Sequence, residues 1–280
     1  MKTIKYLSLI LFPAFAVSQT LSDKYVIDED GIIGEKINPD KTYDENVNLN
    51  NIVYIAGKKF IFSYYYQNSK GDKFLIKKGK DILQPEGYTI AGWEFVDVQK
   101  QDNETVDRIV LQVNSGNPFS NIPEYNQTSI SYEYLMKNGD QLNMETTGAI
   151  ENENNVWIHP PRNNFFEILE LNPFPYVKAP LEIGTHWKWK LEIGENWSDK
   201  RWLEWKGEIE NGYTYEIVDR KSISTKLGTL DCFVIDAKAN SRIGMTKLRS
   251  YFNPVFGFVK LEYQNIDGST TILELDRVEK

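Results

Sequence analysis

Cysteine is nearly absent from this chain of 280 residues, which contains Cys232 alone. A single cysteine excludes an intramolecular disulfide framework, so the fold must be stabilised by burial of apolar surface. Hydrophobic residues make up 41% of the sequence and aromatic residues 13%, which is ample for a packed core. Cys232 lies in an apolar run between Leu230 and Val234. We therefore predict a small buried side chain there rather than a nucleophile.

Histidine is also scarce, with only His159 and His186 in the chain. A catalytic zinc site needs three protein ligands and usually draws on histidine, and the HExxH arrangement is absent. The GxSxG elbow of serine hydrolases and the glycine-rich phosphate loops are missing as well. These absences predict two unrelated loop or surface histidines, no catalytic residue, no metal and no cofactor. Carboxylate-pair chemistry stays open, because the chain has 40 acidic residues.

Apolar runs that could cross a membrane are absent, because no segment approaches about 18 uninterrupted apolar residues. The apolar stretch from Leu7 to Val17 follows Lys2 and Lys5 and leads into Ser18. This pattern predicts a secretory signal peptide at residues 1–18, removed before Gln19. No cysteine lies near that cleavage point, so we expect an exported, soluble protein that is not a lipoprotein. Export of this kind leads to the periplasm, the outer surface or full secretion.

Basic residues are outnumbered by acidic ones. Loss of residues 1–18 removes two lysines and no acid, which leaves 30 basic against 40 acidic residues and a net charge of −10. Nucleic-acid binding depends on clustered lysine and arginine, so a nucleic-acid partner is not expected. Attachment to an anionic membrane is disfavoured by the same average charge.

Helical periodicity is rare, and most of the sequence favours strands. The clearest alternation runs from His186 to Gly194, where tryptophan, leucine and isoleucine occupy one face and charged residues the other. Only Asn164 to Leu171 suggests a helix, with Asn164 as a cap and Glu167 in a capping box. The sequence therefore predicts an all-β or nearly all-β antiparallel fold, with a curved sheet or half-barrel in its carboxy-terminal half. Further strands are expected at 60–66, 73–77, 108–113, 129–136, 141–144, 202–209, 213–218, 232–237, 246–252, 258–263 and 271–275.

Prolines punctuate the middle of the chain, at positions 160, 161, 173, 175 and 180. Because proline resists pairing in a central strand, we expect a connection there rather than sheet. The predicted division is a signal peptide at 1–18, an amino-terminal β-rich half at 19–154, a proline-rich connection with one short helix at 155–180, and an antiparallel β domain at 181–280. The two halves either form separate domains or share one core.

Tryptophan is concentrated between positions 187 and 205, where five of the seven occur. Alternation assigns Trp205 to the core. Trp197 falls in a turn, and Trp202 shares a predicted strand face with Glu204 and Glu208. Those two tryptophans are the exposed candidates for a flat platform that grips a sugar ring. A solvated face explains the two glutamates better than a catalytic pair does.

From Pro180 onward the chain resembles β-rich domains of unknown function in secreted bacterial proteins. The resemblance rests on Pro180, Gly184 and Trp187, on the segment 227–232, and on the hairpin from Tyr251 to Lys260. Some of these domains are similar to periplasmic lipoprotein carriers, in which a curved antiparallel sheet wraps an apolar cavity. The resemblance covers about residues 180–278 and carries no catalytic residues.

These observations favour an exported, non-enzymatic protein that binds a lipid-like molecule or a cell-envelope component in a curved sheet. The expected lining residues are Trp187, Trp189, Phe233, Leu248 and Tyr251. One alternative is carbohydrate binding through Trp197 and Trp202, with hydrolysis by a carboxylate pair as its enzymatic form. Another is a structural protein of the cell surface whose partner is a second protein.

Overall fold

A computed structural model describes residues 24–27, 31–36, 51–83, 85, 87–116 and 126–280. The predicted signal peptide at 1–18 lies outside these residues. Most of the described chain lies in antiparallel strands and very little of it is helical, which confirms the predicted fold class. The strands are β1 (Tyr25–Ile27), β2 (Ile33–Glu35), β3 (Lys59–Gln67), β4 (Lys73–Lys78), β5 (Ile82–Leu83), β6 (Thr89–Ile90), β7 (Trp93–Asp97), β8 (Val106–Val113), β9 (Thr128–Met136), β10 (Gln141–Glu151), β11 (Asn155–Ile158), β12 (Tyr176–Lys178), β13 (His186–Ile193), β14 (Ile209–Thr225), β15 (Gly228–Ser241), β16 (Gly244–Asn253), β17 (Gly257–Gln264) and β18 (Thr270–Glu279). Two 3-10 helices complete the described elements, η1 (Asn164–Leu171) and η2 (Glu195–Trp197).

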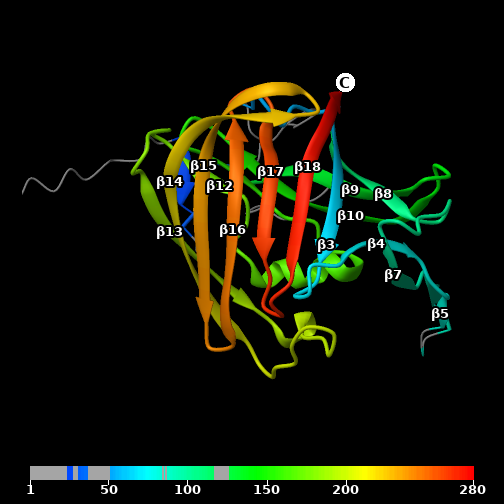
Figure 1. The fold of residues 1–280 in the computed structure, drawn as a ribbon. Helices are drawn as coiled ribbons and strands as arrows, with labels where there is room; N and C mark the ends of the chain where they lie inside the picture. The colour runs from blue at the N-terminus through cyan, green and yellow to red at the C-terminus, as the bar shows by residue number, and fades with distance from the viewer. Residues whose placement is uncertain (1–23, 28–30, 37–50, 84, 86, 117–125) are drawn as a thin grey trace, which may run out of the picture.

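One strongly curved sheet contains strands from both halves of the sequence (Figure 1). Its main path runs β12-β11-β10-β9-β8-β3-β18-β17-β16-β15-β14-β13, and β4 and β7 branch from it at β3. The halves meet where β3 pairs with the carboxy-terminal strand β18, from Lys59 opposite Glu279 to Gln67 opposite Thr270. This pairing joins residues about two hundred positions apart into one hydrogen-bonded layer.

The alternation predicted for 186–194 is present in β13. Trp187, Trp189 and Ile193 are buried, whereas the charged residues between them are exposed. The whole strand pairs with β14 in an unbroken register from His186 opposite Glu216 onward. A period of two thus places one face on the core and the other in solvent.

The strand predicted at 202–209 is wrong, because β14 begins only at Ile209. A turn at residues 200–202 precedes an irregular segment there. The carboxylate of Asp199 stabilises this turn by accepting hydrogen bonds from the backbone and guanidinium N–H groups of Arg201. Asn211 and Gly212 lie within β14, although this pair of residues is typical of a turn. Asn211 is buried because its Nδ2 donates to the carbonyl oxygen of Leu171, 3.1 Å away.

The helix expected at 164–171 occurs at those positions, as the 3-10 helix η1. The predicted capping box is absent. Asn164 is itself helical, with a φ of 58°, and its Oδ1 accepts a hydrogen bond from Asn143 Nδ2 at 2.8 Å. Such a φ is accessible to asparagine because its short side chain bonds locally.

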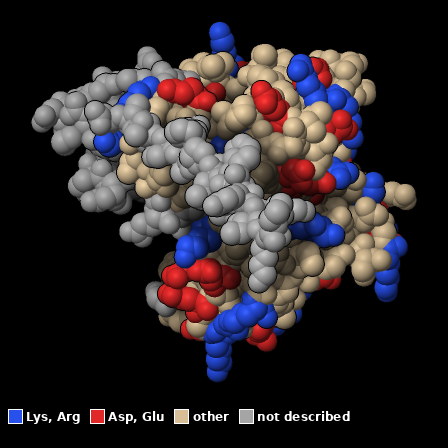
Figure 2. Space-filling view, turned by 90° about the vertical axis from the view of Figure 1, so that its left-hand side faces the viewer, with Lys and Arg blue, Asp and Glu red and all other residues tan. Residues whose placement is uncertain are grey.

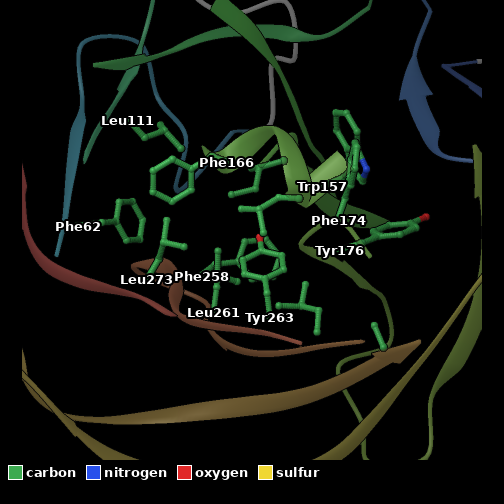
Figure 3. Packing of buried hydrophobic residues seen from close by; sticks show 14 of the residues in the cluster. Phe62, Leu111, Trp157, Phe166, Phe174, Tyr176, Phe258, Leu261, Tyr263 and Leu273 are labelled. Atoms are coloured by element: carbon green, nitrogen blue, oxygen red, sulfur yellow. The ribbon is translucent and has the colours of Figure 1, made fainter. Parts of the chain in front are cut away.

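We call residues 160–175 the plug, because this segment fills the concave side of the sheet. Figure 3 shows Phe166 near Phe62 of β3 and Leu111 of β8, and Phe174 beside Trp157 of β11 and Tyr176 of β12. The apolar plug side chains that are no more than 3% exposed are Phe165, Phe166, Ile168, Leu169, Leu171 and Phe174. The connection predicted from its prolines is therefore part of the core, which it shares with strands on both sides of it in the sequence.

Polar side chains fix the plug to the sheet as well. Asn172 is fully buried, and its Nδ2 donates to the carbonyl oxygens of Lys247 and Gln264 at 3.2 and 3.0 Å. The hydroxyl of Thr246 donates to the carbonyl of Leu171 at 2.7 Å. These hydrogen bonds give a partner to the Asn172 amide nitrogen and the Leu171 carbonyl oxygen. Without them, both polar groups would be buried against β16 and β17 with no hydrogen bond.

Candidate functional site

The concave face, where the sequence predicts ligand-lining residues, is covered by the plug. Trp187 and Trp189 are 7% and 4% exposed. Trp187 stacks on Tyr215 with ring centroids 5.3 Å apart, and Trp189 stacks on Tyr213 at 4.7 Å. The ring of Phe174 in the plug lies 5.1 Å from that of Trp189. Both tryptophan rings are therefore packed against aromatic side chains of the same protein.

The other three expected lining residues do not share one environment. Leu248 is 2% exposed within the hydrophobic core. Phe233 is also buried, and the guanidinium of Arg220 lies 5.1 Å from its ring. The hydroxyl of Tyr251 donates to Glu262 at 3.4 Å. All five expected lining residues are thus buried in the hydrophobic core, but Phe233 and Tyr251 also contact charged side chains at its edge.

A groove of about 190 Å³ lies beneath the end of the β14–β15 hairpin, which crosses towards β18 in Figure 1. We call it the hairpin groove. Its lining residues are Lys221, Ile223, Ser224, Thr225, Lys226, Tyr251, Val259, Lys260, Glu274, Leu275 and Asp276. Val259 and Leu275 are buried and form an apolar floor, and lysines lie at the edges.

An ion pair holds the hairpin over this groove. Lys226 Nζ lies 2.7 Å from Asp276 Oδ2, and the Ser63 hydroxyl donates to Asp276 Oδ1 at 2.8 Å. A β-bulge between Ile217 and Asp219 interrupts the register of β14 just before it bends towards β18. Bulges increase local bending and twist, which is how the strand end is directed across its neighbours.

The lysines of the groove differ in their pairing. Lys260 lies 3.0 Å from Glu262 and 2.9 Å from Glu274. Lys221 forms no ion pair with any described residue, and its Nζ lies 5.6 Å from the ring centroid of Tyr251. Lys221 is therefore the cation available to an anionic group bound in the groove.

The surface shown in Figure 2 carries lysine, arginine, aspartate and glutamate side by side in its described part. Acidic and basic groups are also interspersed around the groove, as the pairs of Lys226 and Lys260 show. Recognition there would depend on individual side chains rather than on a field of one sign.

Trp197 and Trp202, the expected sugar platform, lie side by side but are not both exposed. The expectation of an exposed Trp202 is wrong, because it is 8% exposed and its indole N–H donates to the carbonyl oxygen of Trp197 at 3.3 Å. Its ring also meets that of Phe165 edge-on at 6.3 Å. Trp197 is half-buried, with the guanidinium of Arg162 5.9 Å from its ring. Only one of the two rings can therefore serve as a platform.

An open cleft of about 820 Å³ adjoins Trp197. It is lined by Glu195, Asn196, Ser198, Glu204, Trp205 and Lys206. Glu204 and Glu208 are both exposed, as expected of a solvated surface. The predicted burial of Trp205 is confirmed, since it is 8% exposed.

Sequence reasoning missed a group of buried titratable side chains next to the plug. Tyr134 Oη and the backbone N–H of Arg162 both donate to Glu145 Oε1 at 2.7 Å. His159 is buried rather than exposed, and its Nε2 lies 3.3 Å from a guanidinium nitrogen of Arg162 and 3.4 Å from Glu170 Oε1. No motif joins these residues, which come from β9, β10, the position just before the plug and the plug itself, so no sequence signal identifies the group.

Burial sets the protonation of this group. It raises the pKa of Glu145 to about 7 and that of Glu170 to about 8, and it lowers the pKa of His159 to about 3. His159 Nδ1 lies 2.9 Å from the carbonyl oxygen of Pro160, which can only accept, so Nδ1 carries the proton and Nε2 accepts. A neutral imidazole beside a protonated Glu170 explains how both are buried without a net charge.

Cys232 is buried, and burial raises its pKa to about 11, which disfavours the nucleophilic thiolate. Within the described ranges, no three histidine, cysteine, aspartate or glutamate side chains are grouped so as to hold a metal ion. No helix in the described part of the chain is long and apolar enough to cross a bilayer.

Comparison with known proteins yields only distant structural likenesses. No family model matches the chain, and no curated protein matches it in sequence. A Bacteroides fragilis protein described as exported, with a YmcC-like fold, is 12% identical with a TM-score of 0.39, over 86% of this chain and 100% of its own. A Parabacteroides distasonis protein described as a lipoprotein is 12% identical with a TM-score of 0.37, over 81% and 97%. The hypothetical lipoprotein YmcC from Escherichia coli is 8% identical with a TM-score of 0.33, over 79% and 84%. These descriptions name exported proteins or lipoproteins, whereas the resemblance in the sequence was to β-rich domains of secreted bacterial proteins.

Proposed function

We propose that this protein is an exported, non-enzymatic binding protein that holds a lipid-like molecule or a cell-envelope component in the hairpin groove. The observation that supports this site is the contrast between two surfaces. The concave face is covered by the plug, whereas the hairpin groove offers an apolar floor beside the unpaired Lys221. An apolar recess with a few placed polar groups is the usual form of a small-molecule site.

The size of the groove limits what enters it. Its volume of about 190 Å³ is close to that of a cavity of about 150 Å³ that accepts a benzene ring. A ring or the end of an acyl chain therefore fits, and the rest of a longer ligand would extend along the outer face. Lys221 is placed to contact a carboxylate, sulfonate or phosphate on such a ligand.

Native mass spectrometry of the protein purified from its own source tests the proposal first. An added mass that disappears on organic extraction would reveal a bound molecule, and analysis of the extract would give its chemical class. A bare polypeptide mass, together with no binding of added octanoate, would contradict the proposal.

Variants then locate the site. Binding of octanoate, followed by displacement of an anilinonaphthalene sulfonate probe, should weaken about tenfold on Lys221→Glu, because a charged contact becomes repulsive. Ile223→Asp should weaken it as well, by placing a carboxylate against the apolar floor. Lys238→Glu, on the exposed face of β15, makes the same charge change as Lys221→Glu outside the groove and should leave binding unchanged. Equal loss in Lys238→Glu would place binding elsewhere.

Carbohydrate binding is the second candidate, supported by the half-buried Trp197 beside the open cleft that contains Glu204. A polysaccharide pull-down should lose binding in Trp197→Ala, whose ring is accessible. Trp202→Ala should instead lower stability, because that ring is packed inside. Failure to retain the protein on any polysaccharide tested would contradict this candidate.

A further inference from the structure

The segment that connects β3 to β8 in the sequence forms a two-stranded arm, which branches from the sheet at β3. β4 pairs with β3 only at Phe74 and Lys73, and then continues with β7 as its main partner. Beyond them, β5 and β6 form a short hairpin at the far end of the arm (Figure 1). We call the arm residues 73–97 and its tip β5 and β6 with Tyr88. Residues 84 and 86 lie outside the described chain.

The base of the arm is packed firmly onto the body. Phe95 stacks on Tyr66 with ring centroids 4.7 Å apart, and its ring lies 5.0 Å from Phe165 in the plug. Trp93 contacts Phe95 edge-on at 5.3 Å. Where the two parts of the arm join, a side chain on Gly92 would collide with the backbone oxygen of Lys80. The arm is thus anchored by aromatic contacts, and its strands approach closely at the glycine.

The tip, in contrast, exposes large apolar side chains. Ile82, Leu83, Tyr88 and Ile90 are 52%, 71%, 57% and 44% exposed. Ile82 lies directly opposite Ile90, and Leu83 lies opposite Thr89, so apolar side chains project from both faces of the ribbon. A ribbon that is apolar on both faces cannot be covered by the body on one side alone. Such clusters on a monomer mark an interaction surface.

We propose that the tip of this arm inserts into the surface of a lipid membrane. The tip offers four side chains, far less than the roughly 800 Å² per partner that a stable protein interface buries. Its strands are two residues long and offer little edge for an added strand. Insertion into a bilayer requires neither a large surface nor one of matching shape. It requires only enough exposed apolar side chains to enter the boundary between headgroups and acyl chains.

The residues next to the tip have the chemistry expected at the headgroup layer of a membrane. Lys78 and Lys80 are exposed next to the tip and form no ion pair with described residues, and the exposed Asp81 lies between Lys80 and β5. Lysine and tyrosine are typical of the interface between hydrocarbon and water, where their polar ends reach headgroups while their apolar parts remain in the acyl region. The net charge of −10 calculated for residues 19–280 opposes strongly anionic surfaces. Insertion therefore depends on the apolar side chains of the tip, while the two lysines contact the phosphate groups of the lipid headgroups.

Flotation with vesicles of phosphatidylcholine containing a minority of phosphatidylglycerol tests the proposal on the whole protein. The wild-type protein should float with the vesicles, and Leu83→Asp should reduce the bound fraction by about tenfold or more, because an inserted charge is costly. Met245→Asp is the matched control, since Met245 is 54% exposed on β16, away from the arm. It should float as the wild type does.

A second measurement is independent of the loss of binding. Leu83→Cys, labelled with an environment-sensitive fluorophore, should show a blue shift on addition of vesicles, whereas the buried Cys232 should stay unlabelled. Absence of flotation, an equal loss in Met245→Asp, or no blue shift would each overturn the proposal. Light scattering that shows a dimer dissociated by Leu83→Asp would overturn it in favour of a second copy of the chain.

Discussion

The burial of Glu170 predicts how the free energy of unfolding depends on pH. Its carboxyl has a pKa of about 8 in the folded chain, against about 4.5 when unfolded, because burial disfavours the charged form. The folded state therefore holds a proton that the unfolded state releases first. Its contribution to stability is complete below about pH 4.5 and is lost as the pH rises towards 8.

Replacement by glutamine isolates this contribution. The amide of Glu170→Gln has nearly the same shape as the protonated carboxyl and is neutral like it, yet it cannot ionise. Each pH unit between the two pKa values corresponds to about 1.4 kcal/mol. From pH 5 to pH 9 the free energy of unfolding of the variant should thus gain about 4 kcal/mol relative to wild type. The low pKa of His159 affects both proteins alike and cancels in the difference.

Urea unfolding followed by tryptophan fluorescence at pH 5, 7 and 9 measures this difference. Glu274→Gln is the control, because Glu274 is exposed on β18 and should shift both free energies little. If wild type and Glu170→Gln change in parallel between pH 5 and pH 9, Glu170 is not held protonated by the fold. The assignment of a neutral pair with His159 would then be wrong.

Three further predictions concern the core, a buried carboxylate and the hairpin. Phe166→Ala should lower the free energy of unfolding by about 3–5 kcal/mol, measured in urea, because this ring is 1% exposed in the plug. Glu151→Ala should lower it by about 3 kcal/mol, since its carboxylate accepts the backbone N–H groups of residues 52, 53 and 54; Glu151→Gln should recover part of the loss. Lys226→Ala should change stability by less than about 1 kcal/mol, yet speed amide exchange at the hairpin end, because its ion pair with Asp276 is partly solvated. Unchanged exchange would show that the ion pair does not hold the hairpin.

Local periodicity determined much of the fold in advance. The alternation around Trp187 predicts a strand with one buried face, and the chain forms it with that face inward. The turns near Asn253 and Asp267 fall where asparagine, aspartate, proline and glycine place them. Strand identity and turn position depend on neighbours within a few residues, so they can be read from a sequence.

Tertiary contacts decided what local pattern could not. Residues 202–208 alternate like a strand, but they begin at the end of a turn and form no strand, and Trp202 is buried because it packs on Phe165. The pair Asn211-Gly212 has the composition of a turn and yet lies in a strand, since the plug backbone satisfies its side chain. In each case a contact with a segment more than thirty residues away outweighs the local preference.

The candidate sites show the same division. From the sequence alone come a predicted export signal, an all-β antiparallel fold and an abundance of tryptophan, because these depend on composition and short spacing. Only the tertiary structure shows that the proline-rich connection fills the concave face, that the hairpin end creates a groove over β18, and that Glu145, His159 and Glu170 meet. Pairing β3 with β18 brings together residues separated by most of the chain, and no local pattern encodes such a distance.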